Sequence, residues 1–382
     1  MIYFDNNATM PFSLSAREAW NESQEFFWFN PAGLSNESTK VRVLIKEAKQ
    51  ELGSYFDRSA DQVIFTSGST ESNNLVFQSL SKILGNKKKI LLHADEHSSV
   101  LKPAQSCFRN QWDFFNFYDN KFCADTKILS DLGALVICAA NGETGSISPL
   151  SKALDITDQE GIFSFCDATQ FFGKLGDFQT LKRFDFISGS AHKFGGPKGL
   201  GFLIIPKGVS VCPQLLGGEQ QMGMRSGTEN YPAINSMMAA WKEIYRDLAN
   251  SQILEAPRDL FEKKIVELVK GTKVLFSDQN RLWNTSFLVM PKYESKRWVL
   301  RMNKLGFIIG SGSACSTNKK VEIAEGSFRE KLSSEEQERT LRLSSSLIHS
   351  KKEWMLLLDA FNKTWLSLKE DAKFKNSNVL EI

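Results

Sequence analysis

Short apolar runs alternate with longer amphipathic segments over the first two thirds of the chain, and this alternation constrains the fold most. The apolar runs have the length of strands buried on both faces, at residues 62–66, 89–93, 134–138, 162–166, 184–188 and 201–205. The amphipathic segments predict helices, including residues 38–56, 70–84 and 231–248. Such alternation predicts an α/β fold with a mostly parallel sheet.

The pattern changes after about residue 248 to helices interrupted by short strands, at residues 273–276 and 286–290. We therefore expect two domains. A large α/β domain would comprise residues 14–248, and a smaller α+β domain would comprise residues 1–13 and 249–382. The polar tail, residues 369–382, is expected to be disordered.

Composition excludes several classes of protein. The 382 residues are 42% hydrophobic and 24% charged, which is enough to bury a large core. The net charge of +3 and the lack of a basic stretch interleaved with aromatics argue against a nucleic-acid partner. No apolar stretch approaches the ~20 residues that span a bilayer, and the first residues do not resemble a secretory signal, so we expect a cytoplasmic protein without membrane contact. Six scattered cysteines argue against disulfides and against a metal site.

Lys193 lies between the predicted strand ending near residue 189 and a glycine-rich bend at residues 195–199. Rigid backbone on both sides would hold its amine at the carboxyl end of a strand, where parallel sheets bind ligands. A lysine reacts with an aldehyde when its surroundings lower its pKa. Lys193 is therefore a candidate nucleophile, and an ordinary solvated lysine is the alternative.

An anion-binding turn is predicted at residues 65–72, where a strand, a small-residue turn and a helix start follow one another. Ser69 and Thr70 would offer hydroxyls and unpaired backbone N–H groups at the positive end of the helix dipole. An ordinary helix N-cap explains the same residues.

Two further strand ends carry ionisable side chains. Asp167 could keep a ring nitrogen of a cofactor protonated, or could simply cap the next turn. His97 could lie flat on such a ring, or could be a surface-loop histidine.

The second domain supplies two more candidates. Arg342 alternates with apolar residues, so it should point from a half-buried strand and could grip a substrate carboxylate, or form a structural ion pair. Cys315 lies among small and polar residues, which leave its thiol accessible and reactive.

Taken together, these motifs resemble the cysteine desulfurases of the class-V aminotransferase family, specifically the bacterial kind that feeds iron–sulfur cluster assembly. The matching segments, in order along the chain, are residues 3–9, 66–74, 167–170, 191–193, 217–218, 224–228, 312–315 and Arg342. The resemblance implies a pyridoxal-phosphate-dependent transferase fold of type I, working as a homodimer.

The resemblance also implies a role for each candidate. Lys193 would bind pyridoxal 5′-phosphate covalently and act as general base, and Cys315 would take the sulfur of L-cysteine as a persulfide, releasing L-alanine. Around the cofactor ring would lie His97, Asp167 and Gln170. The phosphate would be held by Ser69, Thr70, Ser190 and His192 of one subunit and by Thr228 of the partner subunit. The substrate would contact Arg342, Asn7 and Asn141. The acceptor would be an iron–sulfur scaffold protein or the machinery of tRNA thiolation.

One departure from the family pattern keeps other functions open. Gly142 stands where the family usually has a second asparagine, in the sequence Asn141-Gly142-Glu143. A selenocysteine lyase or another class-V lyase would not strictly need the thiol of Cys315. A degenerate paralogue could keep the fold and act as a binding scaffold without turnover.

Overall fold

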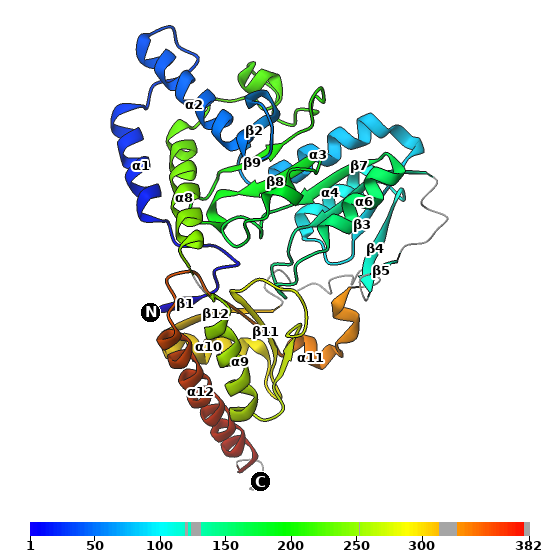
Figure 1. Cartoon of the computed structure of the whole chain (residues 1–382). Helices are drawn as coiled ribbons and strands as arrows, with labels where there is room; N and C mark the ends of the chain where they lie inside the picture. The colour runs from blue at the N-terminus through cyan, green and yellow to red at the C-terminus, as the bar shows by residue number, and fades with distance from the viewer. Residues whose placement is uncertain (119–120, 124–130, 252, 313–326, 378–382) are drawn as a thin grey trace.

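The computed structural model describes residues 1–118, 121–123, 131–251, 253–312 and 327–377. An eight-stranded sheet forms the upper part of the molecule in Figure 1, in the order β2-β9-β8-β7-β6-β3-β4-β5. Its strands are β2 (Val63–Thr66), β3 (Lys89–His93), β4 (Trp112–Tyr118), β5 (Lys121–Cys123), β6 (Leu132–Cys138), β7 (Phe163–Asp167), β8 (Phe186–Ser190) and β9 (Gly201–Ile204). The five central strands from β8 to β4 run parallel, so their carboxyl ends meet at one edge. Strand β9 is antiparallel to both of its neighbours.

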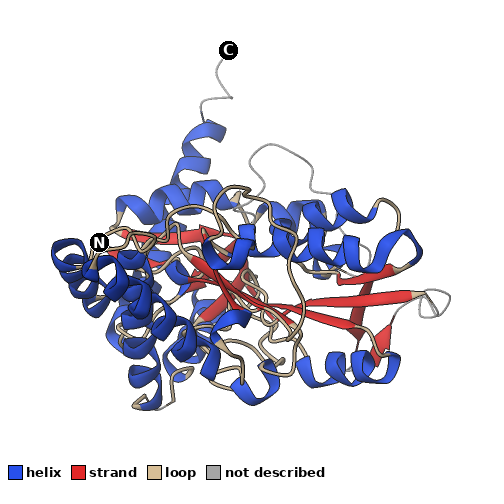
Figure 2. Ribbon diagram, turned by 90° about the horizontal axis from the view of Figure 1, so that it is seen from above, coloured by secondary structure: helices blue, strands red, loops and turns tan. Residues whose placement is uncertain are grey.

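Helices cover both faces of this sheet, as Figure 2 shows from above. One face packs against α2 (Asn36–Ser54), α6 (Leu150–Glu160) and α8 (Tyr231–Ala249), in a core centred on the buried Trp241. The other face packs against α3 (Ser69–Leu84) and α4 (Ser98–Phe108). Because apolar side chains meet them on both sides, the central strands are apolar throughout. Outside these layers, α1 (Leu14–Phe26) lies along α8, and α7 (Phe178–Leu181) is a single turn.

A second sheet of five strands forms the lower part of Figure 1, in the order β1-β12-β13-β11-β10. Its strands are β1 (Ile2–Phe4), β10 (Lys273–Leu275), β11 (Thr285–Val289), β12 (Phe307–Ser311) and β13 (Thr340–Ser344). It packs against α9 (Ala256–Leu268), α10 (Ser295–Lys304) and α12 (Lys351–Ser377), while the short α11 (Ser334–Glu338) precedes β13. Since β1 pairs in parallel with β12, the first residues of the chain join its last third.

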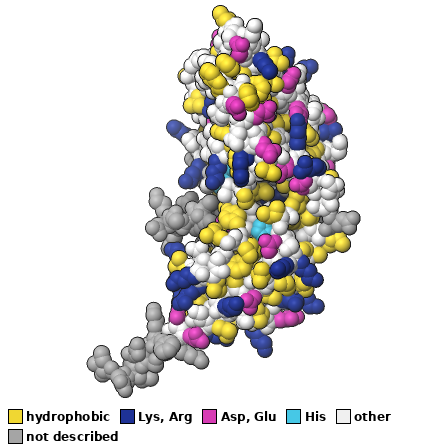
Figure 3. Space-filling view, turned by 90° about the vertical axis from the view of Figure 1, so that its left-hand side faces the viewer, with side chains coloured by type: hydrophobic (Ala, Val, Ile, Leu, Met, Phe, Trp, Pro, Cys, Tyr) yellow, Lys and Arg dark blue, Asp and Glu magenta, His cyan; other side chains and the backbone are white. Residues whose placement is uncertain are grey.

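Five short 3₁₀ helices complete the described elements: η1 (Ala60–Gln62), η2 (Gly85–Lys87), η3 (Ala191–Lys193), η4 (Gln220–Gly223) and η5 (Phe328–Lys331). Within the described ranges, no helix combines the length and the apolar character needed to cross a bilayer. Figure 3 shows the face that carries α1, where acidic and basic side chains are interspersed.

The predicted strands and helices all begin and end within two residues of the observed ones, and the mostly parallel sheet is confirmed. The prediction of a disordered tail is wrong for residues 369–377, because α12 continues to Ser377, and the rest of that tail lies outside the described residues. Buried Trp365 and Leu368 anchor this helix to the second core, and the Lys369 amine lies 4.5 Å from the centre of the Trp365 ring. Strands β1, β4, β5 and β12 were not predicted.

Candidate active site

One cavity of about 700 Å³ lies at the carboxyl ends of the parallel strands. Its walls come from both sheets: Asp167 ends β7, Ser190 ends β8, and Arg342 belongs to β13. Ligands of open α/β sheets bind at this edge, because the strands and helices there leave loops and helix N-termini facing a common space. The cavity is therefore the candidate active site.

Lys193 ends η3, directly after β8, and lines the cavity. Its Nζ donates hydrogen bonds to the backbone oxygens of Asn7, at 2.6 Å, and of Ala8, at 2.9 Å. A neighbouring backbone hydrogen bond, from the N–H of Met10 to the oxygen of His192, joins the same two segments. The amine is thus positioned by the stretch that follows β1.

Asp167 is buried, and each of its carboxylate oxygens accepts a hydrogen bond. Asn73 donates to Oδ2 at 3.0 Å and the backbone N–H of Thr169 donates to Oδ1 at 3.0 Å. Asn73, on α3, also donates to the hydroxyl of Ser99. These contacts fix the orientation of the carboxylate, and the role of Asn73 was not predicted.

His97 is the N-cap of α4, and its Nδ1 accepts a hydrogen bond from the backbone N–H of Ser99 at 3.1 Å. His97 is an exposed residue that lines the cavity. Partial burial lowers the pKa of His97, Asp167 opposes this effect, and Lys193 adds to it. The ring is consequently neutral at physiological pH, as a ring that stacks on a cofactor should be.

The predicted anion-binding turn is present at the start of α3, and Ser67, Ser69 and Thr70 all line the cavity. Gly68 has a φ of 148°, a conformation that favours glycine, and this bend aims the first N–H groups of α3 at the cavity. The hydroxyl of Thr169 donates to Ser69 Oγ at 2.6 Å.

Ser190 and His192 line the same part of the cavity. Burial, reinforced by Lys193, Lys198 and Lys174, lowers the pKa of His192 to about 4, so this imidazole is neutral. Neutral imidazole and hydroxyl groups can donate hydrogen bonds to an anion, and Lys198 adds a positive charge at the cavity wall.

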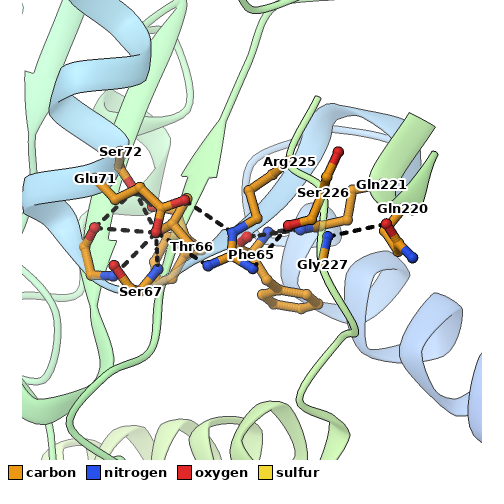
Figure 4. Close-up of polar contacts among 12 residues, drawn as sticks. Phe65, Thr66, Ser67, Glu71, Ser72, Gln220, Gln221, Arg225, Ser226 and Gly227 are labelled. Atoms are coloured by element: carbon orange, nitrogen blue, oxygen red, sulfur yellow. Dashed lines mark hydrogen bonds and ion pairs between the residues drawn. The ribbon is translucent and has the colours of Figure 1, made fainter. Parts of the chain in front are cut away.

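Figure 4 shows the polar contacts behind the turn. Arg225 donates from Nε to Glu71 Oε1 at 3.0 Å, and the N–H of Ser67 donates to Glu71 Oε2 at 2.6 Å. Glu71 lies in the first turn of α3, and its link to Arg225 was not predicted.

The strand that carries Arg342, β13, is buried throughout rather than half-buried, and Arg342 itself is buried and lines the cavity. Nη2 pairs with Asp5 Oδ1 at 2.7 Å, and Nη1 donates to the backbone oxygen of Gly142 at 3.2 Å. Arg342 was predicted either to form a structural ion pair or to bind a substrate carboxylate. It forms an ion pair and also lines the cavity, so the two roles are compatible.

Gln170 and Gly142 occupy adjacent space. A side-chain carbon at position 142 would lie 2.9 Å from Gln170 Nε2, which donates to the backbone oxygen of Asn7 at 3.0 Å. Gln170 Oε1 is buried and has no hydrogen-bond partner among the described residues, although the side chain lines the cavity. The missing side chain at position 142 leaves room for this placement of Gln170.

The two asparagines predicted to contact substrate line the cavity, but their side chains already have partners. Asn141 Oδ1 accepts from the N–H groups of Glu143 and Thr144, and Asn141 Nδ2 donates to the backbone oxygen of Asp95. Asn7 Nδ2 donates to Gly142 O and to Thr285 Oγ1. In this arrangement both amides support the cavity wall.

One described candidate does not line the cavity, and another candidate lies outside the described residues. Thr228 is exposed and is not among the described residues that line the cavity. Cys315 lies outside the described residues. The chain after it returns beside the cavity, where Ser327 Oγ donates to Asp95 Oδ1 at 2.7 Å and Arg329 forms an ion pair with Glu143.

A buried group not singled out from the sequence includes two residues of the cavity wall, Glu96 and Cys138. Ligand atoms of His93, Glu96 and Cys138 all lie within 4.8 Å of one another. His93 Nδ1, however, already accepts the N–H of Asp95 at 3.3 Å. Burial raises the pKa of Glu96 well above its usual value, and the nearby Asp167 adds to this effect.

Comparisons with known proteins point to one family. Residues 2–353 match the family described as aminotransferase class-V. Cysteine desulfurase IscS of Dictyoglomus turgidum is 29% identical over 350 residues, covering 86% of this chain and 88% of that protein. A cysteine desulfurase of Cereibacter sphaeroides is 30% identical over 325 residues, covering 83% of each chain. A solved NifS-like protein superposes with a TM-score of 0.84 at 23% identity, covering 96% of this chain and 99% of that one, which shows the shared fold.

Proposed function

The chain belongs to the class-V aminotransferase family and, within it, to the cysteine desulfurases, and from this premise we propose how its cavity performs desulfuration. The proposed reaction converts L-cysteine to L-alanine with pyridoxal 5′-phosphate bound at Lys193, and leaves the substrate sulfur as a persulfide on Cys315. The family depends on this cofactor.

The cavity residues fit the cofactor. Lys193 offers the amine, the fixed carboxylate of Asp167 suits a protonated ring nitrogen, and the neutral ring of His97 suits stacking. Gln170 Oε1 is buried without a hydrogen-bond partner among the described residues, so it can accept a hydrogen bond from a donor such as a ring hydroxyl. The turn at the start of α3 suits the phosphate. When bound, the cofactor supplies an electron sink for the charge that develops at the α-carbon.

The chain's own groups carry the remaining steps. Arg342 binds the substrate carboxylate, and Asp5 holds the guanidinium in place while it does so. Lys193 Nζ removes the α-proton as general base. The thiolate of Cys315 attacks the substrate sulfur, so that an S–S bond forms as the C–S bond breaks and the electron pair stays on the β-carbon. Protonation of the β-carbon, and return of the proton from Lys193 to the α-carbon, complete alanine.

One observation carries this proposal: Lys193, Asp167 and Arg342 line a single cavity although they come from different sheets. A lysine amine, a buried carboxylate and a buried guanidinium in one space are what an amino-acid substrate and a pyridine ring require together.

The test combines mass spectrometry with sulfide release. After borohydride reduction, the peptide containing Lys193 should carry the mass of the cofactor, and Lys193→Ala should abolish that label. After exposure to cysteine, the peptide containing Cys315 should gain one sulfur, and Cys315→Ala should stop sulfide release. Cys107→Ala, at a partly exposed cysteine outside the cavity walls, is the matched control.

Other outcomes select the alternatives. Alanine formation that survives Cys315→Ala would favour a selenocysteine lyase or another class-V lyase. A purified chain that binds no cofactor at all would favour a scaffold paralogue.

The proposal extends to a homodimer in which Thr228 of the partner subunit reaches the phosphate. The exposed position of Thr228 and the exposed apolar side chains of Trp28 and Leu216 support an interface with a second copy of the chain. Sedimentation should give twice the chain mass of 43.1 kDa. An iron–sulfur scaffold protein as sulfur acceptor and a cytoplasmic location complete the proposal, and the free thiols of Cys138 and Cys166 suit a reducing compartment.

A further inference from the structure

A loop over residues 215–227 packs behind the anion-binding turn, as Figure 4 shows. Gln221 binds both backbone groups of Phe65, its Oε1 accepting from the N–H and its Nε2 donating to the oxygen, each at 2.8 Å. Ser226 Oγ closes the loop on itself by donating to the oxygen of Gly218 at 2.6 Å. The loop therefore holds Phe65, in the strand that leads into the Ser67–Thr70 turn.

The same loop also reaches the residue just after the turn. Arg225 donates to both oxygens of Glu71, from Nε at 3.0 Å and from Nη2 at 3.5 Å. The two side chains are only 23% and 11% exposed, so solvent screens the pair weakly. Through the hydrogen bond from the N–H of Ser67, the Glu71 carboxylate touches the turn itself.

The position of Glu71 creates an electrostatic problem for an anion site. The first N–H groups of α3 are unpaired and positive, and they would attract both the phosphate and the Glu71 carboxylate. Burial raises the pKa of Glu71, but hydrogen bonds from Arg225 and Ser67 outweigh it and leave the net pKa below its usual value. The carboxylate is thus ionised at neutral pH, and like charges this close repel.

Resting on the proposed function, we propose that Arg225 is a positioning residue for the cofactor phosphate: it neutralises Glu71 and keeps the Ser67–Thr70 turn receptive to a dianion. Arg225 does not itself line the cavity, so it acts through Glu71. Without the guanidinium, an unpaired carboxylate would remain beside the phosphate.

The experiment measures dissociation constants of the full chain, freed of cofactor, for two probes. Pyridoxal 5′-phosphate reports the phosphate site, and pyridoxal, which has the same aldehyde and ring without the phosphate, reports everything else. The variants are Arg225→Met, Arg225→Lys, Glu71→Gln and the double variant Glu71→Gln with Arg225→Met. Arg183→Met, at an exposed arginine paired with Asp158, is the matched control.

We expect Arg225→Met to weaken the binding of pyridoxal 5′-phosphate about tenfold and to leave the binding of pyridoxal unchanged. Arg225→Lys keeps the charge and should bind nearly as wild type does. Glu71→Gln removes the repelling charge, so it should bind at least as tightly as wild type, and the double variant should recover most of the loss.

A purely structural role for the pair gives different results. If Arg225→Met weakens the binding of both probes equally, the proposal is overturned. It is also overturned if the double variant binds pyridoxal 5′-phosphate no more tightly than Arg225→Met does. Failure of the proposed function would be distinguishable, because the wild-type chain would then bind neither probe at Lys193.

Discussion

Lys174 is buried, and its amine has no hydrogen-bond partner among the described residues. Burial, together with the positive charges of Lys193 and Arg342, lowers its pKa to about 7. Because the unfolded chain holds this proton up to a pKa near 10.5, the unfolded state binds more protons between pH 7 and pH 10.5. Lys174 thus destabilises the fold at neutral pH, and its cost falls as the pH rises through this window.

Replacing the amine should stabilise the protein at neutral pH. We expect Lys174→Met to raise the urea midpoint at pH 7.5, by up to about 4 kcal/mol in unfolding free energy, and to change it much less at pH 10. Lys264→Met, at an exposed lysine on α9, should have little effect at either pH. If Lys174→Met destabilises the protein equally at pH 7.5 and at pH 10, the lowered pKa assigned to Lys174 is wrong.

Residue types at strand ends were predictable, but their partners were not. Asp167, His97 and Lys193 were found from the pattern of strands followed by polar residues. Asn73 and Glu71 lie in the matched segment 66–74, yet nothing in their spacing showed that they contact Asp167 and Arg225.

Among the elements, β2 is the edge strand whose stability bears most directly on the anion-binding turn. It pairs with β9 on one side, and on its other side the Gln221 amide binds both backbone groups of Phe65 as a neighbouring strand would. Gln221 and Met222 have positive φ angles of 50° and 58°, an uncommon conformation for these residue types, which aims the amide at the strand.

Gln221→Ala should lower the unfolding free energy by about 2 kcal/mol, because two short hydrogen bonds to a buried strand are lost. It should also speed hydrogen exchange at the Phe65 amide. Gln220→Ala removes only one exposed hydrogen bond, from the N–H of Gly227, and should cost less. Similar losses for both variants, with unchanged exchange at Phe65, would refute the role of the amide.

Element types followed the hydrophobic period closely, and the errors have local causes. The end of α12 reads as polar, but Trp365 and Leu368 lie on its buried side, so packing extends a helix that composition does not favour. Strand β1 has only three residues, too few for any period to appear.

At the scale of the whole molecule, the N-terminus joins both sheets to the cavity. Phe4 of β1 is fully buried in the second core, 4.6 Å from the ring of His349 and 4.8 Å from that of Trp354. The residues that follow carry Asp5 to Arg342 and the Asn7 oxygen to Lys193. A loss of packing at Phe4 therefore also loosens the active site.

We expect Phe4→Ala to lower the unfolding free energy by about 3 kcal/mol. It should also raise the KM for cysteine, since Asp5 would hold Arg342 less firmly. Met1→Ala, at a side chain that is 90% exposed, should change neither quantity. Thermal unfolding measures the stability, and steady-state kinetics measure the KM for cysteine. If Phe4→Ala destabilises the protein without changing the KM, packing at Phe4 does not support the active site.

The sequence by itself determined the order and type of most elements, the anion-binding turn and the lysine after β8, because each depends on neighbours a few residues apart. Only the tertiary structure decided that Arg342 pairs with Asp5, that Gln221 completes an edge strand, and that the Asn7 oxygen holds Lys193. Those partners lie 337, 156 and 186 residues apart. Local periodicity records which face of an element is buried, whereas the group that meets that face is selected by packing between distant segments.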